Sequence, residues 1–380
     1  MITPMSRDNL LMVADSEHNA DMLYAVGMFV PDPFIFLALG RRPVIVLPDL
    51  EVDRARRLAR HCRILSLSRC VRRLERSGRH QPDIAEVIQQ VLQAHRRRKV
   101  LVSPAFPHGI AQRLRRLHIK VKVKKGPFLP QREIKRADEI KKISAALTMA
   151  EVGLAEAIQV LRSSKIARNG RLQYRNLPLT SERLRTVIEV AILQAGGFAA
   201  HTIVAGGAQA SEPHEHGHGA LRAHQPIIID VFPRSQKTGY CGDITRTIVR
   251  GRASEAVRRL YHAVSRAQSL ALSLLRSHTP CEMVHRSVQE FFSSEGYKTR
   301  RHNGRLQGFF HGLGHGLGLE IHESPRIGPG SADTLLPGHV VTVEPGLYYP
   351  DVGSVRLEDV ALITHSNPRN LTKFEKVLEV

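Results

Sequence analysis

Two aspartates in the second half of the chain stand where their carboxylates could meet. Asp230 ends the apolar run PIII, which is typical of a buried strand, and Asp243 precedes the strand-like run ITRTIVRG. A hairpin that joins these runs would place the two carboxylates side by side. Adjacent buried carboxylates repel each other unless a cation or a shared proton compensates. One such aspartate alone more often caps a turn, so the pair indicates a site only together with other potential ligands.

Three histidines follow in a glycine-rich segment, HGLGHGLGLEIHESP. They are His311, His315 and His322, and the glycines between them keep the backbone accessible. Imidazole is a ligand that suits Mn, Fe, Co or Zn beside carboxylates. A single histidine would be interpreted as a structural residue, but three histidines among these glycines favour a site.

Two glutamates end the series. Glu344 follows the β-branched run VVTV and precedes Pro–Gly, and Glu358 lies in the strand-like run SVRLEDVALIT. A glutamate at such a position is costly to bury without a partner. A metal ion is one partner and an arginine such as Arg356 is another, so either glutamate alone is ambiguous.

Taken together, these residues form an oxygen-rich set of potential ligands with a single nitrogen. This inventory fits two divalent ions that share a bridging water, whose pKa the ions would lower towards neutrality. The reaction class that it predicts is hydrolysis of an amide or a related bond. The predicted metal ligands are Asp230, Asp243, His315, Glu344 and Glu358.

The elements that must position this set belong to the second of two predicted domains. The first 125 residues alternate short apolar runs with helical patterns, which indicates an α/β domain with a largely parallel sheet and no Gly-rich phosphate loop. Gly126, Pro127 and Pro130 then break the pattern. We therefore expect domains at 1–126 and 132–380.

The second domain is predicted to open on two helices. ADEIKKISAALTMAEVGLAEAIQVLR is a long amphipathic pattern, and SERLRTVIEVAILQAG stops at Gly196–Gly197, as a helix with a C-terminal glycine does. From His201 onward, short apolar runs alternate with glycine-rich turns, which is typical of strands. All the candidate ligands lie in that strand-rich part.

The composition is that of a soluble globular protein of 380 residues, 42% hydrophobic and 24% charged. No apolar run approaches the roughly 20 residues that span a bilayer, and the N-terminus lacks the pattern of a secretory signal. Its four cysteines are scattered and suit a reducing compartment. We therefore expect a cytoplasmic protein without a membrane partner.

The formal net charge of +21 is unusual, and the basic surplus is concentrated in the first domain. Such a surplus attracts nucleic acid electrostatically. The basic residues are spread along helices and loops without interleaved aromatics, so a solvated arginine-rich surface is the preferred interpretation.

The motifs resemble those of the pitta-bread metallopeptidases, the family of methionine aminopeptidase, aminopeptidase P, prolidase and creatinase. The five predicted ligands match the family's metal ligands in order, in IIID, GDITRT, HGLGHGLG, VEPG and VRLED. The separations of 29 residues from His315 to Glu344 and 14 from Glu344 to Glu358 are similar to those of the Xaa-Pro branch. The resemblance implies a creatinase-like N-terminal α/β domain followed by a pitta-bread catalytic domain.

The resemblance also implies roles for residues around the ligands. Glu344 is expected to be a ligand and a proton shuttle, with a general-base role. Three histidines are expected to face the substrate or to stabilise the tetrahedral intermediate: His214, His311 and His322.

Two arginines complete the expected binding residues. Arg326, in HESPR, stands where a prolidase arginine meets a substrate carboxylate, a contact suited to a bidentate fork. Arg356, in VRLED, resembles a supporting arginine near the site and is included among the substrate-binding residues.

The sequence departs from the family pattern between the two aspartates. The segment DVFPRSQKTGYCGD is about two residues longer than the family's D-x-G-type turn, and Phe232–Pro233 replaces its glycine. Extra length in a hairpin is well tolerated, so both ligands should survive while the substrate-facing rim changes. His216 and His218 are expected to belong to that rim.

The activity implied is hydrolysis of the bond between an N-terminal residue and proline, by a water that bridges two divalent ions. Mn²⁺ is the first choice, with Co²⁺ or Zn²⁺ as alternatives; the substrates are short peptides with proline second, and a homodimer is implied. Aminopeptidase P and prolidase stay undecided. The alternatives are a creatinase-like hydrolase and a nucleic-acid-associated binding protein; family members of those kinds lose ligands, whereas all five are present here.

Overall fold

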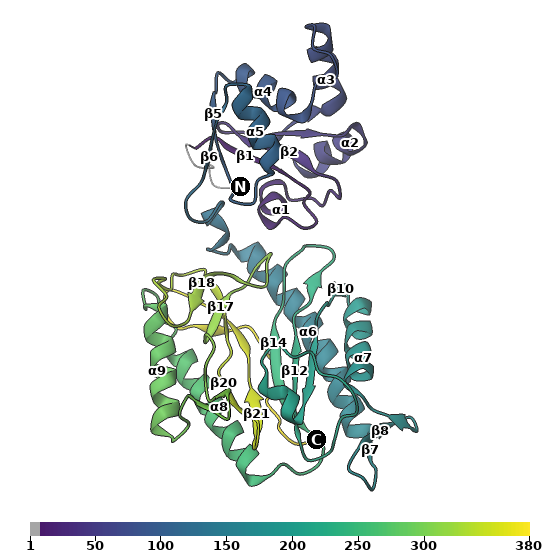
Figure 1. Ribbon diagram of the computed structural model, residues 1–380, viewed down its shortest axis with the longest axis vertical. Coiled ribbons are helices and arrows are strands. Elements are labelled where there is room, and N and C mark those ends of the chain that lie inside the picture. The colour runs from purple at the N-terminus through teal and green to yellow at the C-terminus, as the bar shows by residue number, and fades with distance from the viewer. Residues whose placement is uncertain (1–7) are drawn as a thin grey trace. The chain divides into compact units, whose positions relative to one another are not determined.

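The computed structural model describes residues 8–380. The chain divides into two compact units, Met1–Arg132 and Glu133–Val380 (Figure 1). The division falls just after the break at Gly126–Pro130. Each unit has hydrophobic clusters of its own.

The first unit is built on a six-stranded sheet in the order β4-β3-β2-β1-β5-β6. Three of its pairs are parallel, but β2 is antiparallel to both β1 and β3, so the largely parallel sheet that we expected is a mixed one. The connection 39–43 between β2 and β3 is too short for the crossover of a dozen or more residues that a parallel pair needs. The strands are β1 (Leu10–Ala14), β2 (Phe34–Ala38), β3 (Val44–Leu47), β4 (Arg63–Ser66), β5 (Lys99–Val102) and β6 (Lys120–Val123).

Helices cover both faces of this sheet. Leu11 and Val13 of β1 pack with α3, α4 and α5, whereas Leu10 and Met12 pack with α1 and α2. A strand buried on both faces reads as a continuous apolar run, as this one does. The helices are α1 (Ala20–Val26), α2 (Asp49–Leu58), α3 (Leu67–Arg76), α4 (Ile84–Ala94) and α5 (His108–Arg116).

The second unit opens on the two predicted helices, and both are confirmed. α6 (Ala137–Ser163) and α7 (Ser181–Gln194) pack against each other, and Gly196 follows α7 with a φ of +87°. Thr180 caps α7 by accepting a hydrogen bond from the backbone N–H of Arg183. The other helices of this unit, α8 (Glu255–Leu274) and α9 (Cys281–Ser294), lie on the opposite side of the strands (Figure 1).

The strands of the second unit form two main sheets. One has the order β11-β12-β14, the other β18-β17-β19-β22-β23, and shorter pairs join β7-β8-β9, β10-β13, β15-β16 and β20-β21. A large cluster of apolar side chains from α8, α9 and the strands, including Val264, Phe292, Val341 and Val355, forms the core on that side. The strands are β7 (Lys165–Ile166), β8 (Leu172–Tyr174), β9 (Leu177–Pro178), β10 (Gly197–Phe198), β11 (Ile203–Gly206), β12 (Pro226–Val231), β13 (Arg234–Ser235), β14 (Ile244–Val249), β15 (Arg300–His302), β16 (Arg305–Gln307), β17 (Gly314–Gly316), β18 (Glu323–Ile327), β19 (Val340–Val343), β20 (Gly346–Tyr349), β21 (Gly353–Arg356), β22 (Asp359–Leu362) and β23 (Arg369–Asn370).

One helix among the described residues, α6, is long and apolar enough to cross a membrane by length and composition alone. Half of that apolar window is buried inside the protein, and the core helix of a globular protein meets the same criteria. The finding is therefore weak evidence for a membrane span.

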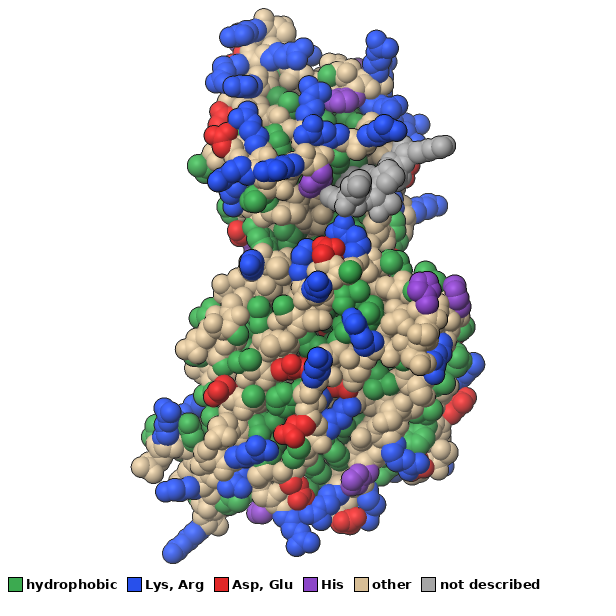
Figure 2. All heavy atoms as spheres, turned by 180° about the vertical axis from the view of Figure 1, so that it is seen from behind, with side chains coloured by type: hydrophobic (Ala, Val, Ile, Leu, Met, Phe, Trp, Pro, Cys, Tyr) green, Lys and Arg blue, Asp and Glu red, His purple; other side chains and the backbone are tan. Residues whose placement is uncertain are grey.

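Basic side chains crowd the surface of the first unit. The face drawn in Figure 2 carries many Lys and Arg side chains on this unit and few Asp or Glu side chains. Arg72, Arg73 and Arg76 on α3 and Arg115 and Arg116 on α5 are all exposed. This placement agrees with an arginine-rich solvated face.

Candidate metal centre

The two aspartates lie at one end of a pair of antiparallel strands. Asp230 is in β12 and pairs with Thr245 of β14, and Val231 pairs with Ile244, so Asp243 directly precedes the paired part of β14. The hairpin predicted from the sequence is therefore present. Its long connection forms β13, which pairs with β10.

Gly242 fixes where the strand that follows Asp243 begins. A Cβ atom at this position would lie 2.5 Å from the backbone carbonyl carbon of Ala146 in α6, a distance that no side chain tolerates. The backbone N–H of Gly242 also donates to the carbonyl of Pro233 at 2.9 Å, which closes the long connection. The glycine thus lets the hairpin press against α6 and sets the position of Asp243.

The remaining predicted ligands come from the five-stranded sheet. His315 is in β17, Glu344 directly follows β19, and Glu358 directly precedes β22. Because Val343 pairs with Asp359, the two glutamates stand at the same end of the β19–β22 pair.

Thr245 connects this end of the sheet to the aspartate hairpin. The backbone N–H of Glu358 donates to the carbonyl of Thr245 at 3.1 Å. The Thr245 hydroxyl donates to Oε2 of Glu358 at 2.7 Å. Main-chain and side-chain contacts therefore bring the two groups of carboxylates to one place.

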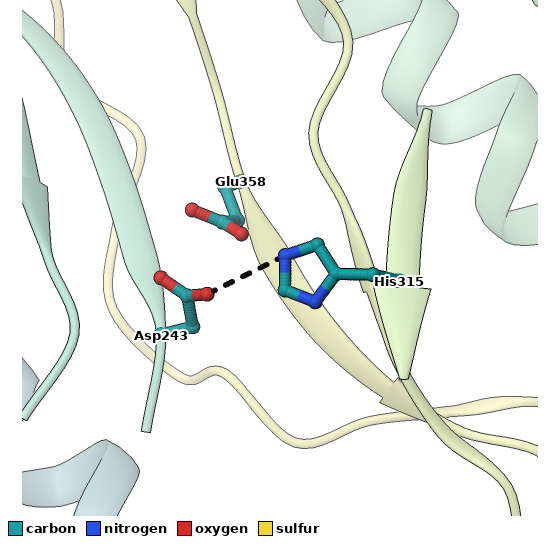
Figure 3. A group of neighbouring side chains, drawn as sticks. All are labelled: Asp243, His315 and Glu358. Atoms are coloured by element: carbon teal, nitrogen blue, oxygen red, sulfur yellow. Dashed lines mark ion pairs between the residues drawn. The ribbon is translucent and has the colours of Figure 1, made fainter. Parts of the chain in front are cut away.

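Three of the five predicted ligands meet in one compact group. One potential ligand atom from each of Asp243, His315 and Glu358 lies within 4.8 Å of the others, and the side chains point toward one another (Figure 3). Nε2 of His315 is 3.8 Å from Oδ2 of Asp243 and 3.3 Å from Oε1 of Glu344. Glu344 therefore lies beside this group.

The carboxylates of the site compete for protons because they are buried together. Burial raises the pKa of Asp243 well above its usual value, and Glu358, Asp230 and Glu344 raise it further. Burial and the neighbouring Glu344 also raise the pKa of Glu358 well above normal. Burial raises the pKa of Glu344 to about 7, although Arg356 opposes the shift. The site thus concentrates negative charge that a cation would stabilise.

Asp230 is held by a buried arginine. Nη2 of Arg356 donates to Oδ2 of Asp230 at 2.6 Å, and Nη1 donates to the hydroxyl of Tyr348 at 3.0 Å. Arg356 is buried, and its Nη1 also donates to the carbonyl of Pro213. Oδ1 of Asp230 is buried and has no hydrogen-bond partner among the described residues. An unpartnered carboxylate oxygen beside four other potential ligands fits a bound divalent ion.

His311 and His322 flank His315 in different ways. The His322 ring packs edge-on against His315 with 4.4 Å between centroids. Nδ1 of His311 lies 2.7 Å from the carbonyl of Gly312 and Nε2 lies 3.0 Å from the Tyr348 hydroxyl. The carbonyl can only accept, so Nδ1 donates to it and Nε2 accepts from the Tyr348 hydroxyl. Burial lowers the pKa of His311 to about 3, so its imidazole is neutral at physiological pH.

The two other predicted residues lie at the edge of the site. His214 and Arg326 are both exposed, on the segment after β11 and on β18. Burial and the neighbouring His315 lower the pKa of His322, and the charges of Arg326 and His214 add to this effect. Both residues are therefore close enough to influence the site electrostatically.

Sequence reasoning missed the residues that support the ligands. Tyr348 is fully buried against His311 and Arg356, and Thr342 donates to Oε1 of Glu344 at 3.2 Å. Tyr348 follows the VEPG motif by three residues, the one signal that could have drawn attention to it. Thr342 and Thr245 read as ordinary strand residues.

A profile of Metallopeptidase family M24 matches residues 141–365, more than half of the chain. The chain belongs to metallopeptidase family M24. Family members are metal-dependent, and the group of Asp243, His315 and Glu358 is a candidate metal site in this one.

Relatives and solved structures support the same conclusion for this M24 protein. The chain is 31% identical to the Xaa-Pro dipeptidase of Pyrococcus furiosus over 248 residues, 65% of each chain. The X-Pro aminopeptidase structure from Thermotoga maritima has a TM-score of 0.82 at 21% identity, over 98% of this chain and 97% of that one. The prolidase structure from Pyrococcus furiosus has a TM-score of 0.78 at 24% identity, over 97% of each chain.

The family match and the Xaa-Pro dipeptidase relative confirm the resemblance to the Xaa-Pro branch. The solved structures confirm the pitta-bread fold with an N-terminal domain. At such identities the structures speak for the fold alone. The sequence match spans 47% of the uncharacterized peptidase YqhT of Bacillus subtilis and 65% of the Pyrococcus furiosus dipeptidase. Activity, substrate and partners therefore belong to the proposal that follows.

Proposed function

We propose that this M24 protein is an exopeptidase that hydrolyses the bond between an N-terminal residue and a following proline. The observation that carries the proposal is the convergence of Asp243, His315 and Glu358 within 4.8 Å, with Glu344 3.3 Å from His315. We assign two divalent ions to these residues and Asp230. When bound, such ions polarise the scissile carbonyl and lower the pKa of the attacking water.

Glu344 is assigned the proton transfer. Its carboxylate lies 3.3 Å from His315, within the group of predicted ligands, and can accept a proton from the attacking water and return it to the leaving nitrogen. Thr342 donates to Oε1 of Glu344 and so orients the carboxylate.

Substrate contacts are assigned to residues at the edge of the site. His322, His311 and His214 are placed to bind the substrate and the tetrahedral intermediate. Arg326 is exposed and is assigned to the substrate carboxylate of a dipeptide. Arg356 donates hydrogen bonds to Asp230, Tyr348 and Pro213. We therefore assign it to orienting Asp230 and not to contacting the substrate.

Several features follow from the family and complete the proposal. Mn²⁺ is the first choice for four carboxylates and one imidazole, with Co²⁺ or Zn²⁺ as alternatives. The catalytic domain is assigned to residues 132–380 and the N-terminal domain to 1–126. We propose a cytoplasmic homodimer that acts on short peptides.

The test compares peptides that differ only at the second position. Mn-loaded protein is incubated with Xaa-Pro dipeptides, with Xaa-Pro-Yaa peptides and with matched Xaa-Ala peptides, and release of the first residue is measured. We expect cleavage only when proline is second, and the ratio of dipeptide to tripeptide cleavage separates a dipeptidase from an aminopeptidase.

Two controls make the outcome interpretable. Asp243→Ala should lose metal and activity together, whereas exposed Glu290→Gln on α9 should keep both. Cleavage of the Xaa-Ala peptides at the same rate would refute the proline assignment. No cleavage despite bound metal would point to another amide substrate. Absence of bound metal would favour the alternative of a nucleic-acid-associated binding protein.

A further inference from the structure

A buried glutamine on α8 holds the backbone directly before two of the predicted ligands. Gln268 is fully buried. Its side-chain amide nitrogen, Nε2, donates to the carbonyl of Val343 at 3.0 Å and to the carbonyl of Leu357 at 3.1 Å. Val343 immediately precedes Glu344, and Leu357 immediately precedes Glu358.

These two carbonyls flank a short gap in the strand pairing. The ladder between β19 and β22 ends at the pair Val343–Asp359, and the ladder between β20 and β21 resumes at the pair Gly346–Arg356. Within the gap, the backbone N–H of Leu357 donates to the carbonyl of Pro345 at 3.4 Å. The Gln268 amide adds a second link across the gap, because it bonds to the backbone directly before each glutamate.

The oxygen of the Gln268 amide indicates that the two N–H groups are the reason for a glutamine at this position. Oε1 of Gln268 is buried and has no hydrogen-bond partner among the described residues. A buried polar atom without a partner is unfavourable, and a methionine or leucine would avoid it. The glutamine is therefore best explained by the two carbonyls that its N–H groups satisfy.

Arg246 holds the same segment from another strand. This buried β14 side chain donates through Nη1 to the carbonyls of Thr245 at 3.0 Å and Glu358 at 2.7 Å. It also pairs with Asp359 at 2.9 Å. Gln268 thus bonds to the carbonyl of Leu357 and Arg246 to the carbonyl of the next residue, Glu358.

We propose that Gln268 is a positioning residue of the metal centre, which reinforces the separation of Glu344 and Glu358 by bonding to the backbone before each. The proposal rests on the proposed function, because it takes both glutamates to be metal ligands. The side chain of Gln268 bonds to the backbone before the two ligands and so acts through them. Its loss should therefore weaken metal binding beyond any loss of general stability.

The test uses Gln268→Met, which keeps the length and apolar bulk of the side chain and removes both donors. The control is Tyr261→Phe on the same helix, because the Tyr261 hydroxyl is buried without a partner among the described residues. Mn²⁺ affinity is measured by calorimetry, and thermal unfolding is recorded with EDTA and with excess Mn²⁺. Where Gln268→Met does not fold, Gln268→Asn replaces it, since it keeps an amide that is one methylene too short.

We expect Gln268→Met to bind Mn²⁺ about 10- to 100-fold more weakly, the range for residues that orient metal ligands. Its gain in melting temperature on adding Mn²⁺ should shrink, whereas Tyr261→Phe should match the wild type in both. Equal affinity in Gln268→Met and wild type would overturn the inference, even if the metal-free variant is less stable. Absence of Mn²⁺ binding by the wild type would instead overturn the proposed function.

Discussion

Metal binding should release the protons that the buried carboxylates of the site hold, because a bound ion displaces them. At pH 7 a group with a pKa of about 7 is half protonated, so Glu344 alone should release about half a proton when an ion binds. Asp243 and Glu358 have pKa values that are also raised, so their release adds to this amount. His315 adds none, because burial lowers its pKa and it is already neutral.

The release can be measured by titrating metal-free protein with Mn²⁺ in two buffers of different ionisation enthalpy. We expect the observed heat to depend on the buffer, and the affinity to fall as the pH decreases through 7, because protons then compete for Glu344. Glu344→Gln should lower the release at pH 7 by at least about half a proton, because it also removes a charge that raises the pKa of Asp243 and Glu358. Glu290→Gln should leave the release unchanged. Heat that is independent of the buffer would refute the electrostatic account of the site.

Three further perturbations test other parts of the structure. Arg356→Met leaves Asp230 without its buried partner and should cost about 3–5 kcal/mol of the free energy of unfolding in EDTA, measured with urea; no loss would contradict the contacts assigned to it. His322→Ala should keep bound Mn²⁺ while kcat falls, since the ring packs on His315 without being assigned as a ligand; loss of metal together with activity would refute that division of roles. Burial lowers the pKa of His339 to about 4, so the folded state resists its protonation. The contribution of His339 to the free energy of unfolding should be complete above the unfolded pKa of about 6.5 and should decrease by about 3 kcal/mol as the pH falls to 4. His339→Gln should flatten the pH dependence of the free energy of unfolding between these values, and an unchanged slope would contradict the role of His339.

The sequence predicted the elements whose signals are local. The apolar periodicity of residues 137–162 and the glycines after residue 195 predicted α6 and α7, and the run PIIID followed by GDITRT predicted the aspartate hairpin. The family and its fold were predictable because motifs carry them. A largely parallel sheet was expected in the first unit and the sheet is mixed, since apolar runs indicate strands but not the direction in which neighbours pair.

The supporting residues could not be predicted, for a physical reason. Gln268, Thr245 and Arg246 act by bonding to backbone carbonyls or to ligands far along the chain. A backbone carbonyl leaves no trace in the sequence, so a glutamine on an amphipathic helix carries no sign of what it holds. Only the hydrogen bonds from Gln268 of α8 to Val343 at the end of β19 and to Leu357 show its role.

The most direct test of the account is the number of metal ions that the protein holds. Metal-free wild type is reloaded with Mn²⁺, freed of excess ion, and its metal content is measured by mass spectrometry beside Asp243→Ala and Glu358→Ala. The account predicts about two ions for each wild-type chain and fewer in both variants. Wild type without metal, or variants with full occupancy, would contradict the claim that these five residues form a two-metal centre.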